Sequence, residues 1–209
     1  MVERHEQMTV AEARRALYVD FEGPKDGPPV LLGVLRRQLR QQVVDADFRS
    51  LDPEYASLVD VVRSVVRRAR KGDRRIVSWS THDLDKVQEL GDTEPELVAA
   101  FEACWVNGLR LAERWAARTT GIVRPGRSTL VAYEALISFA VPASAEAGHV
   151  GETVRRLRPR FRSGQAATLN QSGRWRDLLE HNAYDCRGLR AICVRAADDI
   201  EAQDRRSGR

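Results

Sequence analysis

ALYVDFEG, residues 16–23, is the stretch of sequence on which the fold assignment depends. Its apolar residues at odd positions alternate with Tyr18, Asp20 and Glu22, which predicts a β-strand with one apolar face. Asp20 and Glu22 would then project from the same opposite face. Because an uncompensated buried charge is costly, this pair indicates either a bound divalent cation or the solvated face of an edge strand.

The segments that follow predict two more strands and a turn. Residues 23–29 are rich in glycine and proline, and they lead to the apolar run 30–35. Residues 40–46 have the pattern of a third strand. Together with the first strand, these segments predict an antiparallel three-strand meander.

Helical periodicity dominates the rest of the chain. A helix is expected to begin with Asp52 as its N-cap and Pro53 at its first position. A short fourth strand, residues 76–79, and a short helix from residue 83 to 90 come next. The remaining periodic segments predict helices at about 94–117, 128–139, 149–161 and 174–202. The order therefore predicts one α/β domain over residues 16–202, between a polar N-terminal arm (1–15) and a polar tail (203–209).

Composition limits the classes of protein to consider. The chain has 209 residues and a net charge of +4, and all but three of its 34 basic residues are arginines. This charge is compatible with a polyanionic partner, although a GC-rich genome explains the arginines equally well. Three cysteines without a CxxC pair argue against a disulfide framework and favour a reducing, cytoplasmic location. Neither a signal peptide nor a membrane span is expected.

Three further residues could carry chemistry together with the first-strand pair. Asp83 lies where the fourth strand gives way to a helix, with Asp85 as a competitor and a helix N-cap as the plain alternative. His181 and Asp185 lie four residues apart on the last helix and share a face, which is also the pattern of an ordinary surface pair. The order is an acid-x-acid strand, an acid after the fourth strand and an acid on the last helix.

This order resembles the RNase H-like exonucleases of the DEDD superfamily, in particular a bacterial branch of predicted RecB-family-associated exonuclease domains. The similar segments are ALYVDFEG (16–23), RIVSWSTHDLDKVQEL (75–90) and LLEHNAYDCRGLRAI (178–192). His181 stands where that branch usually has tyrosine. The resemblance implies an RNase H-like fold, with a mixed central sheet, its three-strand antiparallel meander, flanking helices and a helical C-terminal half.

The resemblance also implies a metal-dependent nuclease, of the 3′–5′ exonuclease type, that acts on single-stranded DNA or RNA. Two Mg²⁺ or Mn²⁺ ions would be held by Asp20, Glu22, Asp83 and Asp185, with Asp20 bridging both. His181 would take the proton from the attacking water. The alternatives are an RNase H-like module that binds nucleic acid without turnover, and a structure-specific endonuclease of the same fold.

A run of arginines could hold the phosphate backbone of the nucleic acid. It lies in the predicted helix 149–161 and just beyond it, and a solvated helix face explains it equally well. Its members are Arg155, Arg156, Arg158, Arg160 and Arg162.

Overall fold

The computed structural model describes residues 6–24, 27–119, 121–145, 150–163, 165 and 168–208. At its centre is a five-stranded mixed sheet in the order β3-β2-β1-β4-β5. The strands are β1 (Leu17–Glu22), β2 (Leu31–Leu35), β3 (Leu39–Val43), β4 (Ile76–Ser78) and β5 (Trp105–Asn107). The first three strands are antiparallel, whereas β4 lies parallel to β1 and β5 parallel to β4. The predicted mixed α/β class and the three-strand meander are therefore confirmed.

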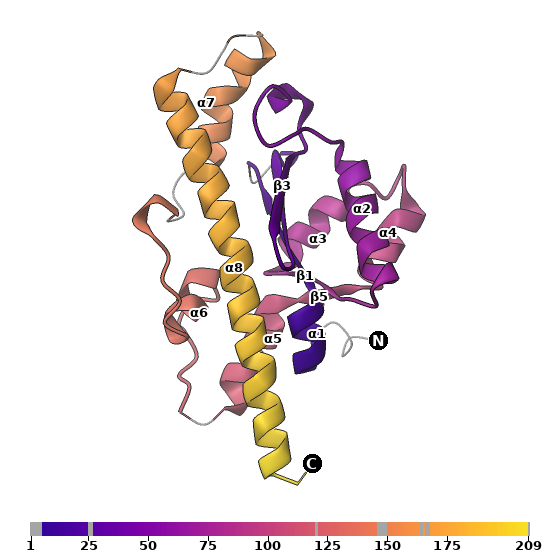
Figure 1. Ribbon diagram of the computed structural model, residues 1–209, viewed down its shortest axis with the longest axis vertical. Coiled ribbons are helices and arrows are strands. Elements are labelled where there is room, and N and C mark those ends of the chain that lie inside the picture. Colours follow the sequence, from indigo (N-terminus) through magenta and orange to yellow (C-terminus); the bar gives the residue numbers. More distant parts are fainter. Residues whose placement is uncertain are drawn as a thin grey trace.

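The alternation of β1 directs its two faces into two different layers. Leu17, Val19 and Phe21 are buried against α2 (Leu58–Lys71) and α4 (Pro95–Glu102). Tyr18, on the opposite face, belongs to the core formed with α5 (Gly108–Arg118) and α8 (Leu169–Arg206). Figure 1 shows this arrangement, with the sheet between the long helix α8 on one side and α2, α3 and α4 on the other.

Two helix starts differ from the prediction because serine side chains set them. The helix expected from Asp52 begins as α2 at Leu58, where the Ser57 side chain accepts a hydrogen bond from the Asp60 amide. In α3 (Thr81–Gln88), Ser80 is the N-cap and accepts from the His82 amide. Asp83 therefore lies in the first turn of α3 and is not its cap, so the N-cap alternative for this residue is wrong.

The single long helix predicted for residues 94–117 is wrong. Strand β5 interrupts it, and α4 and α5 lie on either side. The Asn107 side chain accepts a hydrogen bond from the Arg110 amide and caps α5, so a new helix begins directly after the strand. Trp105 and Val106 suit a strand, and pairing with β4 outweighs the helical periodicity of this alanine-rich stretch.

The last helix is longer than predicted, and it contacts most of the fold. It runs from Leu169 to Arg206 and begins with a capping box formed by Thr168 and Gln171. Along its length it packs against α1 (Val10–Arg15), α5, α6 (Leu130–Leu136) and α7 (Val150–Arg162), and it crosses β1, β2 and β3. Part of the expected N-terminal arm is thus the helix α1, whose Ala13 is buried.

A third core joins the start of α8 to α7 and to the short helix η2 (Ala46–Phe48). Trp175 stacks on Phe48, with ring centroids 5.8 Å apart, and Phe161 packs on the same ring. Trp175, like Trp105 and Trp115, is buried in the protein interior. No helix within the described residues is long and apolar enough to span a membrane.

Candidate metal centre

Asp20 and Glu22 project from the same face of β1, as their spacing predicted, and α8 covers this face. Asp20 is half-buried, whereas Glu22 is only 7% exposed. The Asn182 side chain of α8 donates to Asp20 Oδ2 over 2.7 Å, and His181 Nε2 lies 3.5 Å from Glu22 Oε1. The two carboxylates are therefore enclosed between the sheet and α8, and β1 is a central strand, not an edge strand.

Asn182, which was not among the predicted site residues, connects Asp20 to α8 as a clamp. Its Nδ2 donates to both the backbone oxygen and the carboxylate of Asp20, while its Oδ1 accepts from Gln41 Nε2 over 2.9 Å. The clamp fits only because Gly33, directly opposite Asp20 in the sheet, has no side chain. A Cβ at Gly33 would lie 2.9 Å from both Asn182 Cγ and Cys186 Sγ. In the sequence, the position of Asn182 in the segment LLEHNAYD, next to His181, was the one feature that could have indicated this role.

Asp83 reaches the same region from α3. It is 5% exposed, and its Oδ1 accepts a hydrogen bond from the Phe21 amide, which lies between Asp20 and Glu22 on β1. Asp85, the competing acid, is exposed on the same helix. Of the two, only Asp83 is directed at β1, where it fixes the strand and adds a further ionisable carboxyl.

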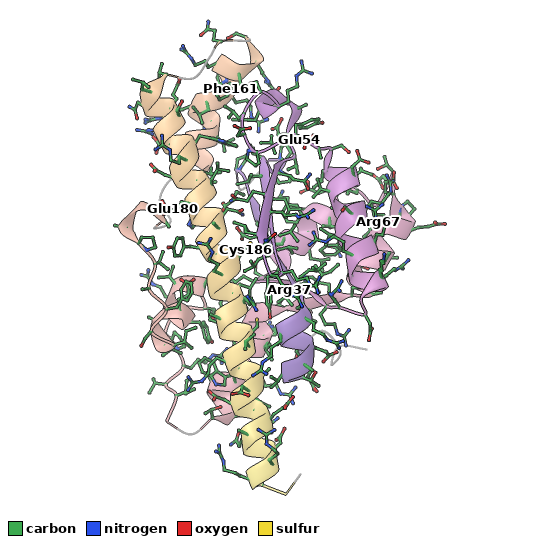
Figure 2. The ribbon with its side chains drawn as sticks, in the orientation of Figure 1. Arg37, Glu54, Arg67, Phe161, Glu180 and Cys186 are labelled. Atoms are coloured by element: carbon green, nitrogen blue, oxygen red, sulfur yellow. The ribbon has the colours of Figure 1, made fainter. Side chains whose placement is uncertain are left out.

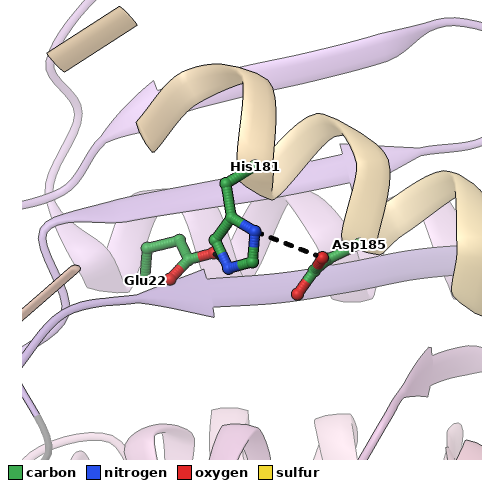
Figure 3. Close-up of side chains that lie close together, drawn as sticks. All are labelled: Glu22, His181 and Asp185. Atoms are coloured by element: carbon green, nitrogen blue, oxygen red, sulfur yellow. Dashed lines mark ion pairs between the residues drawn. The ribbon is translucent and has the colours of Figure 1, made fainter. Parts of the chain in front are cut away.

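His181 and Asp185 complete the group from α8, one helical turn apart. Glu22, His181 and Asp185 bring ligand atoms within 4.8 Å of one another, and Figure 3 shows the imidazole between the two carboxylates. His181 Nδ1 lies 2.9 Å from the carbonyl oxygen of Ala145 and 3.5 Å from Asp185 Oδ1. A carbonyl only accepts hydrogen bonds, so Nδ1 carries a proton, and the other ring nitrogen, Nε2, faces Glu22. Asp20 and Asp83 lie outside this compact group of three.

Burial and mutual repulsion raise the pKa values of all four acids. Burial, followed by repulsion from Asp185, raises the pKa of Asp20 to about 7. Burial and then repulsion from Asp20 raise the pKa of Asp83 to about 8 and that of Glu22 well above its usual range. Burial likewise raises the pKa of Asp185 to about 7. Such a cluster of buried carboxyls favours either proton uptake or a cation that neutralises them.

A sixth ionisable group, Glu134 of α6, lies near Asp185. It is 2% exposed, and among the described residues its Oε1 has no hydrogen-bond partner. Its carboxyl fills the notch left by Gly188, one turn beyond Asp185, and repulsion from it contributes to the raised pKa of Asp185. Burial raises the pKa of Glu134 itself to about 7. Nothing in the sequence around Glu134, a single acid in a short apolar helix, indicated that it would lie near the site.

A pocket of about 830 Å³ opens beside Glu22. Arg155 of α7 and His82 of α3, both exposed, line it. The pocket is completed by Phe21, Gly23, Pro24 and Gly151. It gives a ligand access to Glu22 from outside, and Arg155 adds a positive charge to its lining.

The arginines of α7 do not form one free basic face. Arg158 forms an ion pair with Asp45 over 2.7 Å, and Arg162 pairs with Asp47 over 2.8 Å. Arg156 pairs with Glu152 on its own helix. Intramolecular carboxylates thus compensate these three charges, and of the run only Arg155 lines the pocket beside Glu22.

The donor set fits a hard divalent cation. Carboxylate oxygens are the ligands that Mg²⁺ and Mn²⁺ prefer, and imidazole nitrogen is compatible with Mn²⁺. The residues that could hold an ion directly are Glu22, His181 and Asp185, with Asp20 beside them. The raised pKa values fit the same interpretation, because a cation would relieve the repulsion that causes part of each shift.

Comparison with known proteins returned no relative: no family model, no curated protein and no solved structure matches the chain.

Proposed function

We propose that this protein is a metal-dependent nuclease of the RNase H-like fold that hydrolyses phosphodiester bonds. The observation that carries the proposal is the arrangement of four acids and one histidine around the end of β1. Glu22, His181 and Asp185 form a compact group beneath α8. Asp20 is linked to α8 through Asn182, and Asp83 of α3 accepts from the Phe21 amide between Asp20 and Glu22. An antiparallel three-strand meander followed by a helix and parallel strands is the layout of the RNase H-like fold, and it supports the assignment.

The residues have separate roles in this proposal. Asp20, Glu22, Asp83 and Asp185 would hold two Mg²⁺ or Mn²⁺ ions. When bound, the cations would lower the pKa of a water molecule and stabilise the charge that develops at the phosphodiester. His181 would accept the proton of the attacking water at Nε2, because Ala145 occupies Nδ1. Arg155, at the rim of the pocket beside Glu22, would contact a phosphate of the incoming strand.

By its resemblance, the enzyme would remove nucleotides from the 3′ end of single-stranded DNA or RNA in the cytoplasm. The test is hydrolysis of end-labelled oligonucleotides of both kinds, with Mg²⁺ or Mn²⁺ and with EDTA. We expect a ladder of shortened products that requires the metal. Defined internal fragments would indicate a structure-specific endonuclease instead.

Paired substitutions on α3 provide the sharpest control. Asp83→Asn removes a buried carboxyl of the cluster, whereas Asp85→Asn removes an exposed carboxyl two residues away. We expect Asp83→Asn, like Asp20→Ala, to lower the cleavage rate by about a hundredfold or more while the protein stays folded. Asp85→Asn should cleave as the unchanged protein does. Full activity in folded Asp20→Ala would contradict the proposal, and Mn²⁺ binding without any product would favour a nucleic-acid-binding role.

A further inference from the structure

A second feature of the surface is a pocket of about 700 Å³ on the side of α8 away from the acids. Five arginines line it against a single carboxylate, Asp198. They come from three parts of the chain: Arg14 from α1, Arg37 from the turn between β2 and β3, and Arg187, Arg190 and Arg195 from α8. Figure 2 shows Arg37 where the sheet adjoins α1.

Most of the positive charge in this pocket is uncompensated. Arg195 pairs with Asp199 over 2.7 Å, and Arg187 lies over the ring of Tyr184. Among the described residues, no carboxylate forms an ion pair with Arg14, Arg37 or Arg190. Bringing several arginines together without partners costs electrostatic energy, which an anionic ligand would offset.

The pocket differs from the metal centre in position and chemistry. Arg187 is two residues beyond Asp185, and Arg190 is five, so both lie on other faces of α8 than the carboxylate. The floor of the pocket is apolar and consists of Leu35, Ala191 and Val194. Planar guanidinium groups match phosphate oxygens in pairs, and an apolar floor suits the sugar and base that accompany a phosphate.

We propose that this arginine pocket binds the phosphate groups of nucleotides, either free or within a single strand. The proposal does not rest on nuclease activity, because the pocket contains none of the residues of the metal centre. It assigns the direct phosphate contacts to Arg37 and Arg190. These two residues line the pocket from the hairpin turn and from α8, and within the described part of the chain neither forms an ion pair.

The test is fluorescence anisotropy with a labelled single-stranded oligothymidylate, in EDTA so that the strand stays intact. The double variant Arg37→Gln/Arg190→Gln is compared with Arg67→Gln/Arg127→Gln, which removes the same charge from two exposed residues outside the pocket. We expect the pocket variant to bind about tenfold more weakly or worse. The slope of log K against log salt should fall by about two in magnitude, one for each lost phosphate contact. The control should bind within about twofold of the unchanged protein.

Competition then identifies the source of the phosphate. Displacement of the labelled strand by millimolar adenosine monophosphate would assign the pocket to free nucleotides, whereas displacement only by unlabelled oligonucleotide would assign it to a strand. Equal weakening in both double variants would overturn the proposal, because charge alone would then explain binding. Displacement by polyglutamate as readily as by oligonucleotide would also overturn it, since the pocket would then accept any polyanion. Thermal unfolding of each variant verifies that the protein is folded.

Discussion

At the scale of single residues, Asn182 shows how a neutral side chain can organise charged ones. It is fully buried and uses both ends of its amide, donating to Asp20 from Nδ2 and accepting from Gln41 at Oδ1. It thereby links β1, β3 and α8 at one point. The order of the acids in the sequence made them candidate metal ligands, whereas this linking role depends on atoms that meet only in the folded chain.

Substituting Asn182 by alanine should loosen Asp20. We expect a loss of about 1–3 kcal/mol in the free energy of unfolding, because the half-buried oxygens of Asp20 lose their donor and the Gln41 amide keeps only its hydrogen bond to the Leu179 carbonyl. Mn²⁺ binding should weaken as well. Urea unfolding and calorimetric titration with Mn²⁺ measure the two effects. Asn170→Ala, an exposed asparagine of the same helix, is the matched control and should change neither. Unaltered Mn²⁺ affinity in Asn182→Ala would show that the clamp does not position Asp20.

Arg155 and Arg156 form a second matched pair at this scale. Both are exposed on α7, but Arg155 lines the pocket beside Glu22 and Arg156 pairs with Glu152. If Arg155 contacts a substrate phosphate, Arg155→Gln should raise KM by about tenfold with kcat little changed. Arg156→Gln should leave KM within about twofold. Steady-state cleavage of a labelled oligonucleotide provides both constants, and equal effects of the two changes would remove Arg155 from the proposed binding role.

At the scale of elements, the close contact of α8 with the sheet depends on a glycine in β2. Gly33 lies opposite Asp20, and the space above it holds the side chains of Asn182 and Cys186. This contact sets the height of α8 over β1, and therefore the separation between the acids of β1 and those of α8.

Adding one methyl group at Gly33 should therefore disturb the packing of α8 on the sheet. We expect Gly33→Ala to lower the free energy of unfolding by about 1–3 kcal/mol, because the new Cβ overlaps side chains of α8. Gly173→Ala is the opposite case. Gly173 lies within α8, and a Cβ added there would have nothing within 4 Å, so this change should raise the free energy of unfolding by about 0.4–1 kcal/mol. Chemical denaturation measures both. A higher free energy of unfolding in Gly33→Ala would mean that α8 can shift away from the sheet without loss of stability.

The elements also show where local sequence patterns fail. β1 follows from alternation and β2 from its apolar run after a turn rich in glycine and proline, and both are local properties. Strand β5 does not, because Trp105 and Val106 become a strand only through pairing with β4. The start of α2 was misassigned because Asp52-Pro53 carries a stronger local start signal than Ser57, where the helix begins.

At the scale of the whole molecule, α8 brings distant segments into one site. Its first third packs on α7 and η2, its middle carries His181, Asn182 and Asp185 over β1, and its last third packs on α1 and α5. The segment after α6 contributes as well, since Ala145 holds the imidazole of His181. The charge of the candidate metal centre is thus a property of the complete fold.

This charge predicts the pH dependence of stability without metal. In the unfolded chain the carboxyls titrate near about 4, but burial and repulsion raise the pKa of Asp20 and Asp185 to about 7 and of Asp83 to about 8. Between these values the folded protein binds more protons than the unfolded chain. The free energy of unfolding should therefore fall as pH rises from about 4 to about 8.

Thermal unfolding in EDTA across this range measures the effect. Mn²⁺ should raise the melting temperature more at pH 8 than at pH 5.5, because the cation competes with protons for the same carboxyls. The double variant Asp20→Asn/Asp185→Asn should flatten the pH dependence in EDTA. A metal-free protein that becomes more stable as pH rises over this range would contradict the electrostatic description of the cluster.

The sequence by itself determined the local features: the amphipathic strand 16–23, the meander, most helices and the identities of Asp20, Glu22, Asp83, His181 and Asp185 as candidates. These follow from side-chain alternation, helical spacing and the order of motifs, all of which are properties of short segments. The tertiary structure alone decided which groups surround the acids. It directed Asp83 and not Asp85 at β1, added Asn182 and Glu134, neutralised much of the arginine run on α7 and gathered other arginines beside α8. The physical reason is that burial, repulsion and hydrogen bonding depend on distances between residues far apart in the chain, which no local pattern encodes.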